Sequence, residues 1–294
     1  MSAPSLTAFG RYLLLERLGA GSTAEVFRVR PLRQAADAGP ELALRRLRPE
    51  LGGDEPSRAR FLHEAEVARG LVHPLFCPVV EVGEADGFPY LVLELISGPT
   101  LARLLRWLRL RGRGASLGVA AHVGAELCGG LYHAQAPPFG LVHGDVSPGN
   151  VLIGSGGRVK LVDGAAPTGE HSSEVRGSLG YLAPEVLAGE ATSHGSDLYS
   201  CAVLLWELIA HRRLFPARSL GEALRLRGAP LPALEEAGQP VEQTLRRALH
   251  RDPAQRFQDG RALRAALLVD SRRAAVECSA AELSRLIRLA FGEG

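Results

Sequence analysis

The sequence predicts an α+β fold in which a small, strand-rich lobe is followed by a larger, helical lobe. In the first third of the chain, short apolar segments are separated by Gly, Pro and Asp turns, which is the pattern of strands. After the turn at 97–99, apolar residues recur every three or four positions, as in amphipathic helices. A chain of 294 residues buries ~75% of its unfolded surface, so this fold needs no disulfide or metal to stabilise it.

The small lobe is expected to contain five strands and one helix. The helix begins at Asp54, because Pro56 is favourable in a first turn and apolar residues follow at helical spacing as far as Ala68. The predicted strands are 12–18, 25–30, 41–47, 79–82 and 90–95.

The large lobe is expected to be helical, with one strand-turn-strand segment between 141 and 162. Near the end of the chain, Ser279 and Glu282 have the spacing of a capping box. The helix behind them has one apolar face, formed by Leu283, Leu286, Ile287, Ala290 and Phe291. The other predicted helices are 101–108, 119–131, 197–210, 241–250 and 260–268.

The composition excludes several classes of protein. A net charge of +2 is too close to balance for a nucleic-acid-binding or membrane-coating protein, so we expect neither partner. The four cysteines are far apart and form no C-x-x-C pair, which favours a reducing compartment over disulfides or zinc. Because we find no signal pattern and no apolar run of ~18 residues, we expect a cytoplasmic protein.

A glycine-rich turn joins the first two predicted strands, where residues 19–26 read GAGSTAEV. Gly19 and Gly21 would let backbone N–H groups approach phosphate oxygens without a side chain in the way. No helix follows directly, which argues against a dinucleotide-binding strand-turn-helix unit. Taken alone, the turn is also consistent with a plain hairpin.

The segment 142–152 reads VHGDVSPGNVL and carries the clearest catalytic signal. Asp145 can accept a proton from a hydroxyl nucleophile, and Asn150 can hold a divalent metal through its amide oxygen. Asp163 stands at the end of the next strand, as a second metal ligand. Asn150 is the only asparagine in the chain, which favours a specific role for it.

Further motifs follow in a fixed order: GYLAPE at 180–185, SDLYS at 196–200, and Asp252-Pro253 with Arg256. In this order and spacing, the motifs resemble those of protein kinases, specifically the bacterial Ser/Thr kinases of eukaryotic type, over residues 12–270. The resemblance implies the two-lobed protein kinase fold, with ATP and Mg²⁺ bound between the lobes. It also implies a protein substrate or a partner kinase. The implied divisions are an N-terminal extension (1–11), an N-lobe (12–96), a C-lobe (97–270) and a C-terminal helix packed on the C-lobe (271–294).

The resemblance also implies a role for each site residue. Asp145 would be the catalytic base, Glu64 the glutamate of helix C, and Asn150 and Asp163 the magnesium ligands. Glu185 would pair with Arg256, and Asp197 would brace the catalytic loop. The residues implied to contact the nucleotide are Gly19, Gly21, Val26, Ala43, Leu93 (the gatekeeper), Glu94, Ile96 and Leu152.

The sequence departs from the family pattern at the position of the phosphate-binding lysine. Residues 42–45 read LALR, so Arg45 stands where the lysine is expected. A planar guanidinium does not replace a compact ammonium between a glutamate and phosphates. Arg45 either pairs with Glu64 or lies on the surface of its strand.

Two further departures concern the catalytic and activation segments. The D-F-G motif reads DGA at 163–165, so the phenylalanine is either substituted or deleted. Gly144 replaces the arginine of H-R-D, which removes the guanidinium that a phosphorylated loop would contact. The candidate acceptors in that loop are Thr168, Ser172, Ser173 and Ser178.

These observations predict a Ser/Thr protein kinase-like signalling protein that binds ATP with Mg²⁺ and transfers phosphate weakly or not at all. The alternative is an active Ser/Thr protein kinase in which Arg45 or another arginine takes the place of the lysine. A third hypothesis, a small-molecule phosphotransferase of kinase-like fold, is disfavoured by the APE motif at 183–185 and by Asp197.

Overall fold

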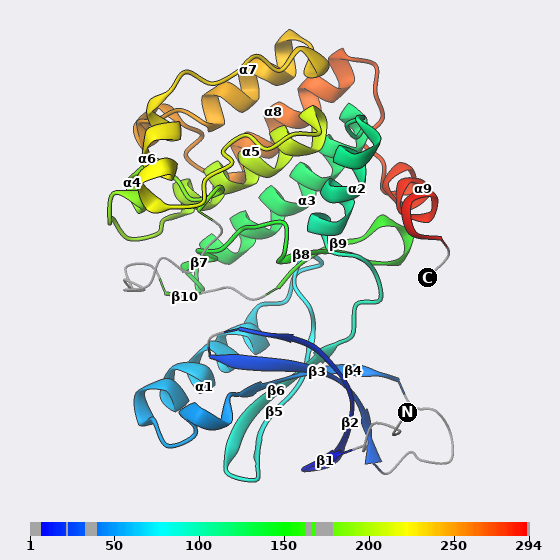
Figure 1. The fold of residues 1–294 in the computed structure, drawn as a ribbon, viewed down its shortest axis with the longest axis vertical. Helices are drawn as coiled ribbons and strands as arrows, with labels where there is room; N and C mark the ends of the chain where they lie inside the picture. Colours follow the sequence, from blue (N-terminus) through cyan, green and yellow to red (C-terminus); the bar gives the residue numbers. More distant parts are fainter. Residues whose placement is uncertain (1–6, 22, 33–39, 163–165, 168–178, 293–294) are drawn as a thin grey trace. The chain divides into compact units, whose positions relative to one another are not determined.

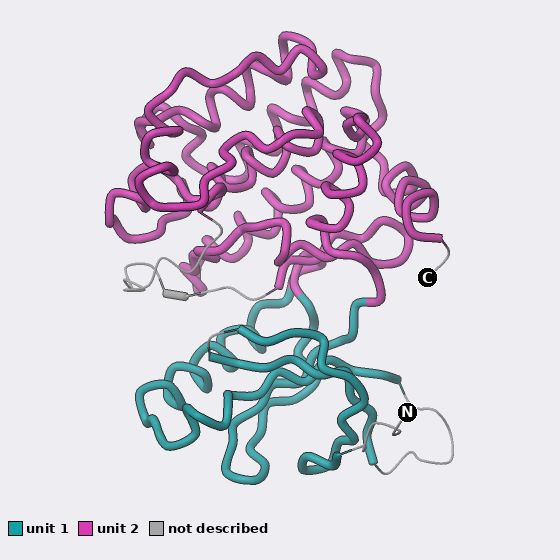
Figure 2. The backbone as a smooth tube through the Cα atoms, viewed as in Figure 1, with its two compact units in different colours: residues 1–72, 77–96 teal, residues 73–76, 97–294 magenta. Residues whose placement is uncertain are grey.

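The computed structural model describes residues 7–21, 23–32, 40–162, 166–167 and 179–292. It divides into two compact units, shown in Figure 2. The first unit comprises residues 1–72 and 77–96, and the second comprises residues 73–76 and 97–294.

The first unit is built on a six-stranded antiparallel sheet with the strand order β1-β2-β3-β4-β6-β5 (Figure 1). All five strands predicted for the small lobe are confirmed. The sixth, β1, lies in the segment assigned above to an N-terminal extension, where Phe9 is buried against Tyr90. The strands are β1 (Thr7–Phe9), β2 (Tyr12–Ala20), β3 (Ala24–Pro31), β4 (Leu42–Leu47), β5 (Val79–Ala85) and β6 (Phe88–Glu94).

One long helix, α1 (Glu55–Gly70), packs on this sheet. Asp54 is its N-cap, and the Asp54 side chain accepts a hydrogen bond from the backbone N–H of Ser57, so the predicted start is confirmed. Phe61 and Ala65 are buried against the sheet, and Glu64 lies on the same part of the helix but is partly exposed. A short 3-10 helix, η2 (Pro49–Leu51), precedes α1.

The second unit is helical, and its central helix is α5 (His194–Ala210). Every residue of α5 from Ser196 to Ala210 is buried. The helices predicted for this lobe are confirmed, and two others, α4 and α6, were not predicted. The remaining helices are α2 (Leu101–Arg111), α3 (Leu117–Gln135), α4 (Pro184–Leu187), α6 (Leu220–Gly228), α7 (Gln239–Ala248), α8 (Gly260–Arg273) and α9 (Ala280–Phe291).

Two small antiparallel pairs of strands carry the loops of the second unit. β8 (Val151–Ile153) pairs with β9 (Val159–Leu161) across the 3-10 turn η3 (Ser155–Gly157). β7 (Leu141–Val142) pairs with β10 (Ala166–Pro167). Two further 3-10 turns are η4 (Glu235–Ala237) and η5 (Pro253–Gln255).

The C-terminal helix α9 packs on η3, α3 and α2. The predicted capping box is wrong: the Ser279 side chain makes no capping hydrogen bond. Glu282 instead accepts a hydrogen bond of 2.6 Å from the hydroxyl of Ser116, the N-cap residue of α3. The partner of Glu282 is therefore a residue distant in sequence, Ser116, and not the nearby Ser279. At η3 the contact is so close that a Cβ added to Gly157 would lie 2.0 Å from the carbonyl oxygen of Ala280.

None of the helices in the described part of the chain has both the length and the apolar character needed to span a bilayer.

Candidate active site

The catalytic loop lies between β7 and β8, and a hydrogen-bonded pair orders its acidic residue. The side-chain amide nitrogen of Asn150 donates to the backbone oxygen of Asp145 at 3.0 Å and to its carboxylate at 2.7 Å. The amide oxygen makes neither of these bonds, and it is the atom of this side chain that can bind a metal. Oxygen donors of this kind suit Mg²⁺.

Asp197, near the start of α5, braces this loop as the resemblance implied. Its carboxylate accepts backbone N–H bonds from His143 at 2.7 Å and from Gly144 at 2.9 Å. Burial raises the pKa of Asp197 to about 7, although the two N–H donors favour the charged form. Gly144 adopts a φ of +77°, which a residue with a side chain rarely takes.

His143 is buried and precedes Asp145 by two residues. Its Nδ1 accepts the backbone N–H of Asp145 at 3.3 Å, which requires that nitrogen to be unprotonated. Burial lowers the pKa of His143 to about 4, so the ring is neutral at pH 7. A neutral His143 therefore helps to orient the backbone of Asp145.

In the first unit, Arg45 pairs with Glu64. Arg45 lies on β4 and its Nη2 is 3.4 Å from the Glu64 carboxylate on α1. The guanidinium also lies 5.4 Å from the centre of the Phe61 ring, one turn before Glu64. Of the two alternatives for Arg45, the structure therefore shows the ion pair with Glu64.

Lys160, the only lysine in the chain, does not take the place of Arg45. It is buried on β9, and its Nζ donates to the backbone oxygen of Phe76 at 2.8 Å. Its ammonium therefore hydrogen-bonds within the second unit.

The residues implied to contact the nucleotide are distributed over both units. In the first unit, Ala43 on β4 is directly opposite Leu93 on β6, and the turn after Gly19 is closed by a hydrogen bond from Gly21 N to Ala24 O. In the second unit, Leu152 lies on β8 and is partly buried. Their role, like that of Val26, Glu94 and Ile96, stays a prediction.

Some sequence-predicted positions lie outside the described residues. These are Asp163, with the rest of the DGA segment, and the four candidate phosphate acceptors. Among the described residues, no group of three His, Cys, Asp or Glu side chains is arranged to hold a metal.

The pair implied between Glu185 and Arg256 is confirmed. Two parallel hydrogen bonds of 2.7 Å join the guanidinium to the carboxylate, and Arg256 is only 1% exposed. A second buried arginine, Arg227 on α6, was missed because α6 itself was not predicted. It donates to the backbone oxygens of Leu179 and Leu182, just before the APE motif.

The chain is similar to known proteins in sequence and in fold. The protein kinase domain family matches residues 12–267. Serine/threonine-protein kinase PrkC of Bacillus subtilis is 29% identical over 260 residues, covering 85% of this chain and 39% of PrkC. Serine/threonine-protein kinase PknB of Mycobacterium tuberculosis is 30% identical over 285 residues, covering 91% of this chain and 44% of PknB.

The chain thus spans less than half the length of these two curated relatives. Among solved structures, the PknI kinase domain of Mycobacterium tuberculosis is similar, with a TM-score of 0.66 and 26% identity, covering 92% of this chain and 100% of that one. The family match, the sheet-and-helix architecture and the ordered catalytic loop agree: the chain belongs to the protein kinase family and has bacterial Ser/Thr kinases as its relatives.

Proposed function

We propose that this chain binds ATP together with Mg²⁺, and that its phosphotransfer is weak or lost. It would act in signalling as a pseudokinase, through contact with a protein substrate or a partner kinase. The observation that carries the proposal is the arginine at position 45 and its ion pair with Glu64.

The chemistry of the guanidinium supports a loss of catalytic power. In the family, a lysine ammonium bridges the helix C glutamate and the phosphates as a compact charge. Arg45 presents a planar fork that is bound to Glu64 and lies against Phe61. Loss of one preorganised donor lowers a rate by ~10²–10³. Starting from the ~1–100 per second typical of kinases, the remaining turnover would be slow.

The ordered Asn150 amide supports retained binding of Mg²⁺ with the nucleotide. Its oxygen, with the Asp163 carboxylate that the resemblance implies, is a donor set suited to this cation. When bound, MgATP would supply the phosphoryl group. Asp145 would take the proton from an acceptor hydroxyl.

A second candidate, an active Ser/Thr protein kinase, is favoured by the same loop. His143, Asp197 and Asn150 all hydrogen-bond to the segment that carries Asp145. This arrangement would be expected if Asp145 still acts as a base.

One measurement tests nucleotide binding, which both functions require, and a second distinguishes the two functions. MgATP at millimolar concentration should raise the melting temperature; no shift would exclude nucleotide binding. Transfer from radiolabelled ATP, to the chain itself and to generic acceptor proteins, should be slow or absent for the unmodified protein and absent for Asp145→Ala. Arg45→Lys should raise transfer above both. Robust transfer by the unmodified protein that Asp145→Ala abolishes would establish the active kinase instead.

A further inference from the structure

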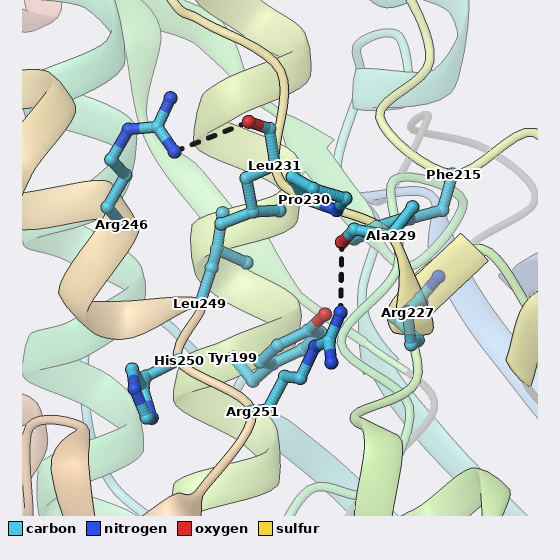
Figure 3. A pocket seen from close by; sticks show the side chains of 10 residues that line it. All are labelled: Tyr199, Phe215, Arg227, Ala229, Pro230, Leu231, Arg246, Leu249, His250 and Arg251. Carbon is cyan, nitrogen blue, oxygen red and sulfur yellow. Dashed lines mark hydrogen bonds between the residues drawn. The ribbon is translucent and has the colours of Figure 1, made fainter. Parts of the chain in front are cut away.

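The second unit contains a cavity of about 340 Å³, formed by parts of α5, α6 and α7 and by the loops that follow them. Figure 3 shows its side chains, with hydrogen bonds from Arg246 to the Leu231 oxygen and from Arg251 to the Ala229 oxygen. This volume is within the range of ~300–1,000 Å³ typical of small-molecule sites. The lining residues are Tyr199, Phe215, Arg227, Ala229, Pro230, Leu231, Arg246, Leu249, His250 and Arg251.

The cavity is lined by basic groups and by no acidic residue. Arg246 is neutralised by Glu242, 2.8 Å away. Arg251 donates instead to the backbone oxygens of Gly228 and Ala229, and no carboxylate among the described residues pairs with it. The lining therefore has an excess of positive charge.

Arg227 is the strongest sign of this excess. Its side chain is 5% exposed, and its hydrogen bonds go to the backbone oxygens of Leu179 and Leu182, not to a carboxylate. The guanidinium lies 3.6 Å from the centre of the Phe215 ring, which offsets part of its lost hydration. Its Nη1 is buried and makes no hydrogen bond of good geometry with a described residue. The Glu207 carboxylate acts on Arg227 electrostatically, but no hydrogen bond joins these two described side chains. A buried cation with no directly bonded counter-ion is costly, and an anion nearby reduces that cost.

Apart from the three arginines and His250, the lining is mostly apolar. The aromatic rings are those of Phe215 and Tyr199, and Pro230, Leu231 and Leu249 contribute alkyl groups. Binding pockets commonly combine such a lining with a few charged groups that orient the ligand.

We propose that this cavity is a binding site for a small phosphate monoester with an aromatic or apolar body. The phosphate would lie near Arg251 and offset the charge of Arg227, and the body would pack on Leu231 and Leu249. Because this site lies wholly within the second unit, the proposal does not depend on ATP binding.

The probe for this proposal is phenyl phosphate, titrated without magnesium and followed by calorimetry. We expect it to bind more tightly than phenol, which lacks the charge, and than inorganic phosphate, which lacks the ring. Excess ATP should not displace phenyl phosphate, since the two sites are separate.

Variants locate the site. Arg251→Gln should weaken the binding of phenyl phosphate at least tenfold, whereas Arg106→Gln, which removes the same charge from an exposed position on α2, should leave it unchanged. Leu231→Ala should weaken phenyl phosphate but not inorganic phosphate, and it tests the site even if Arg251→Gln disturbs folding. Displacement by ATP, equal affinity for phenol, or unchanged affinity in both pocket variants would overturn the proposal.

Discussion

Two buried titratable side chains lie beside Asp145, and burial shifts their pKa values in opposite directions. The pKa of His143 falls from 6.5 to about 4, and that of Asp197 rises from 3.8 to about 7. Between about pH 4 and pH 6.5, the folded protein therefore keeps His143 unprotonated and Asp197 protonated, whereas the unfolded chain favours the opposite for both.

We predict that His143 makes stability fall as the pH is lowered. Between pH 6.5 and 4 the unfolded chain protonates this histidine and the folded protein does not, so the free energy of unfolding decreases by about 3 kcal/mol in total. Asp197 acts in the opposite direction. Between pH 3.8 and 7 the unfolded chain loses the proton of this carboxyl and the folded protein keeps it, so the free energy of unfolding decreases as the pH rises. His143→Asn separates the two, since asparagine keeps an acceptor near Nδ1 and does not titrate.

The measurement is urea unfolding of both proteins from pH 7 to pH 4. The stability of the unmodified protein relative to His143→Asn should decline across this range. An identical pH dependence in the two proteins would show that His143 is not held neutral.

At the scale of elements, the turn η3 offers a matched pair of glycines. Gly156 and Gly157 both have a left-handed φ, of +70° and +77°. A Cβ on Gly156 would meet nothing within 4 Å, whereas one on Gly157 would meet the Ala280 carbonyl of α9.

We predict that Gly156→Ala costs only the ~1–2 kcal/mol of the left-handed conformation. Gly157→Ala should cost clearly more, because it also forces α9 away from the turn. Thermal unfolding of the two variants measures the difference. Equal losses of stability would mean that the contact with α9 contributes nothing.

The Glu185–Arg256 pair, which joins α4 to the segment before α8, permits a second matched comparison. Its N–O distance of 2.7 Å equals that of the Arg212–Glu236 pair. The Glu185 and Arg256 side chains, however, are 8% and 1% exposed, whereas those of Arg212 and Glu236 are 46% and 35% exposed. Glu185→Gln should cost ~3–5 kcal/mol, because it leaves Arg256 buried with a neutral partner. Glu236→Gln should cost under ~1 kcal/mol. Urea unfolding of both variants tests whether burial makes the difference.

The sequence predicted the elements that are long and periodic and missed those that depend on distant partners. Strand β1 has three residues and is ordered by burial of Phe9 against Tyr90, which no local pattern reveals. The capping box was wrong because the partner of Glu282 is Ser116, 166 residues away.

The same distinction applies to the site. The catalytic loop could be predicted because Asp145 and Asn150 are close in sequence and share a motif. The contacts of Arg227 could not, because its partners are backbone oxygens 45 and 48 residues away, and any residue type supplies these.

At the scale of the whole molecule, the folded second unit extends beyond the family match, which ends at residue 267. Leu283 of α9 is fully buried in the main core, while Leu289 on the same helix is 73% exposed. We predict that ending the chain at Ala275 lowers the melting temperature by ~5 °C or more, because a buried leucine alone contributes ~2–5 kcal/mol. Leu289→Ala, which leaves α9 in place, should change it little. Equal melting temperatures for the truncated and unmodified chains would contradict the role of α9.

The position of Lys160 has a practical consequence for following this protein in solution. Every other basic side chain of the Lys/Arg class is an arginine, so the chain has one ε-amine, and that amine is 5% exposed. Reagents that acylate lysine should therefore leave it unmodified while the second unit is folded and modify it once the contact with Phe76 opens. The mass added at Lys160 would then serve as a natural single-site reporter of local unfolding, with no label introduced by mutation.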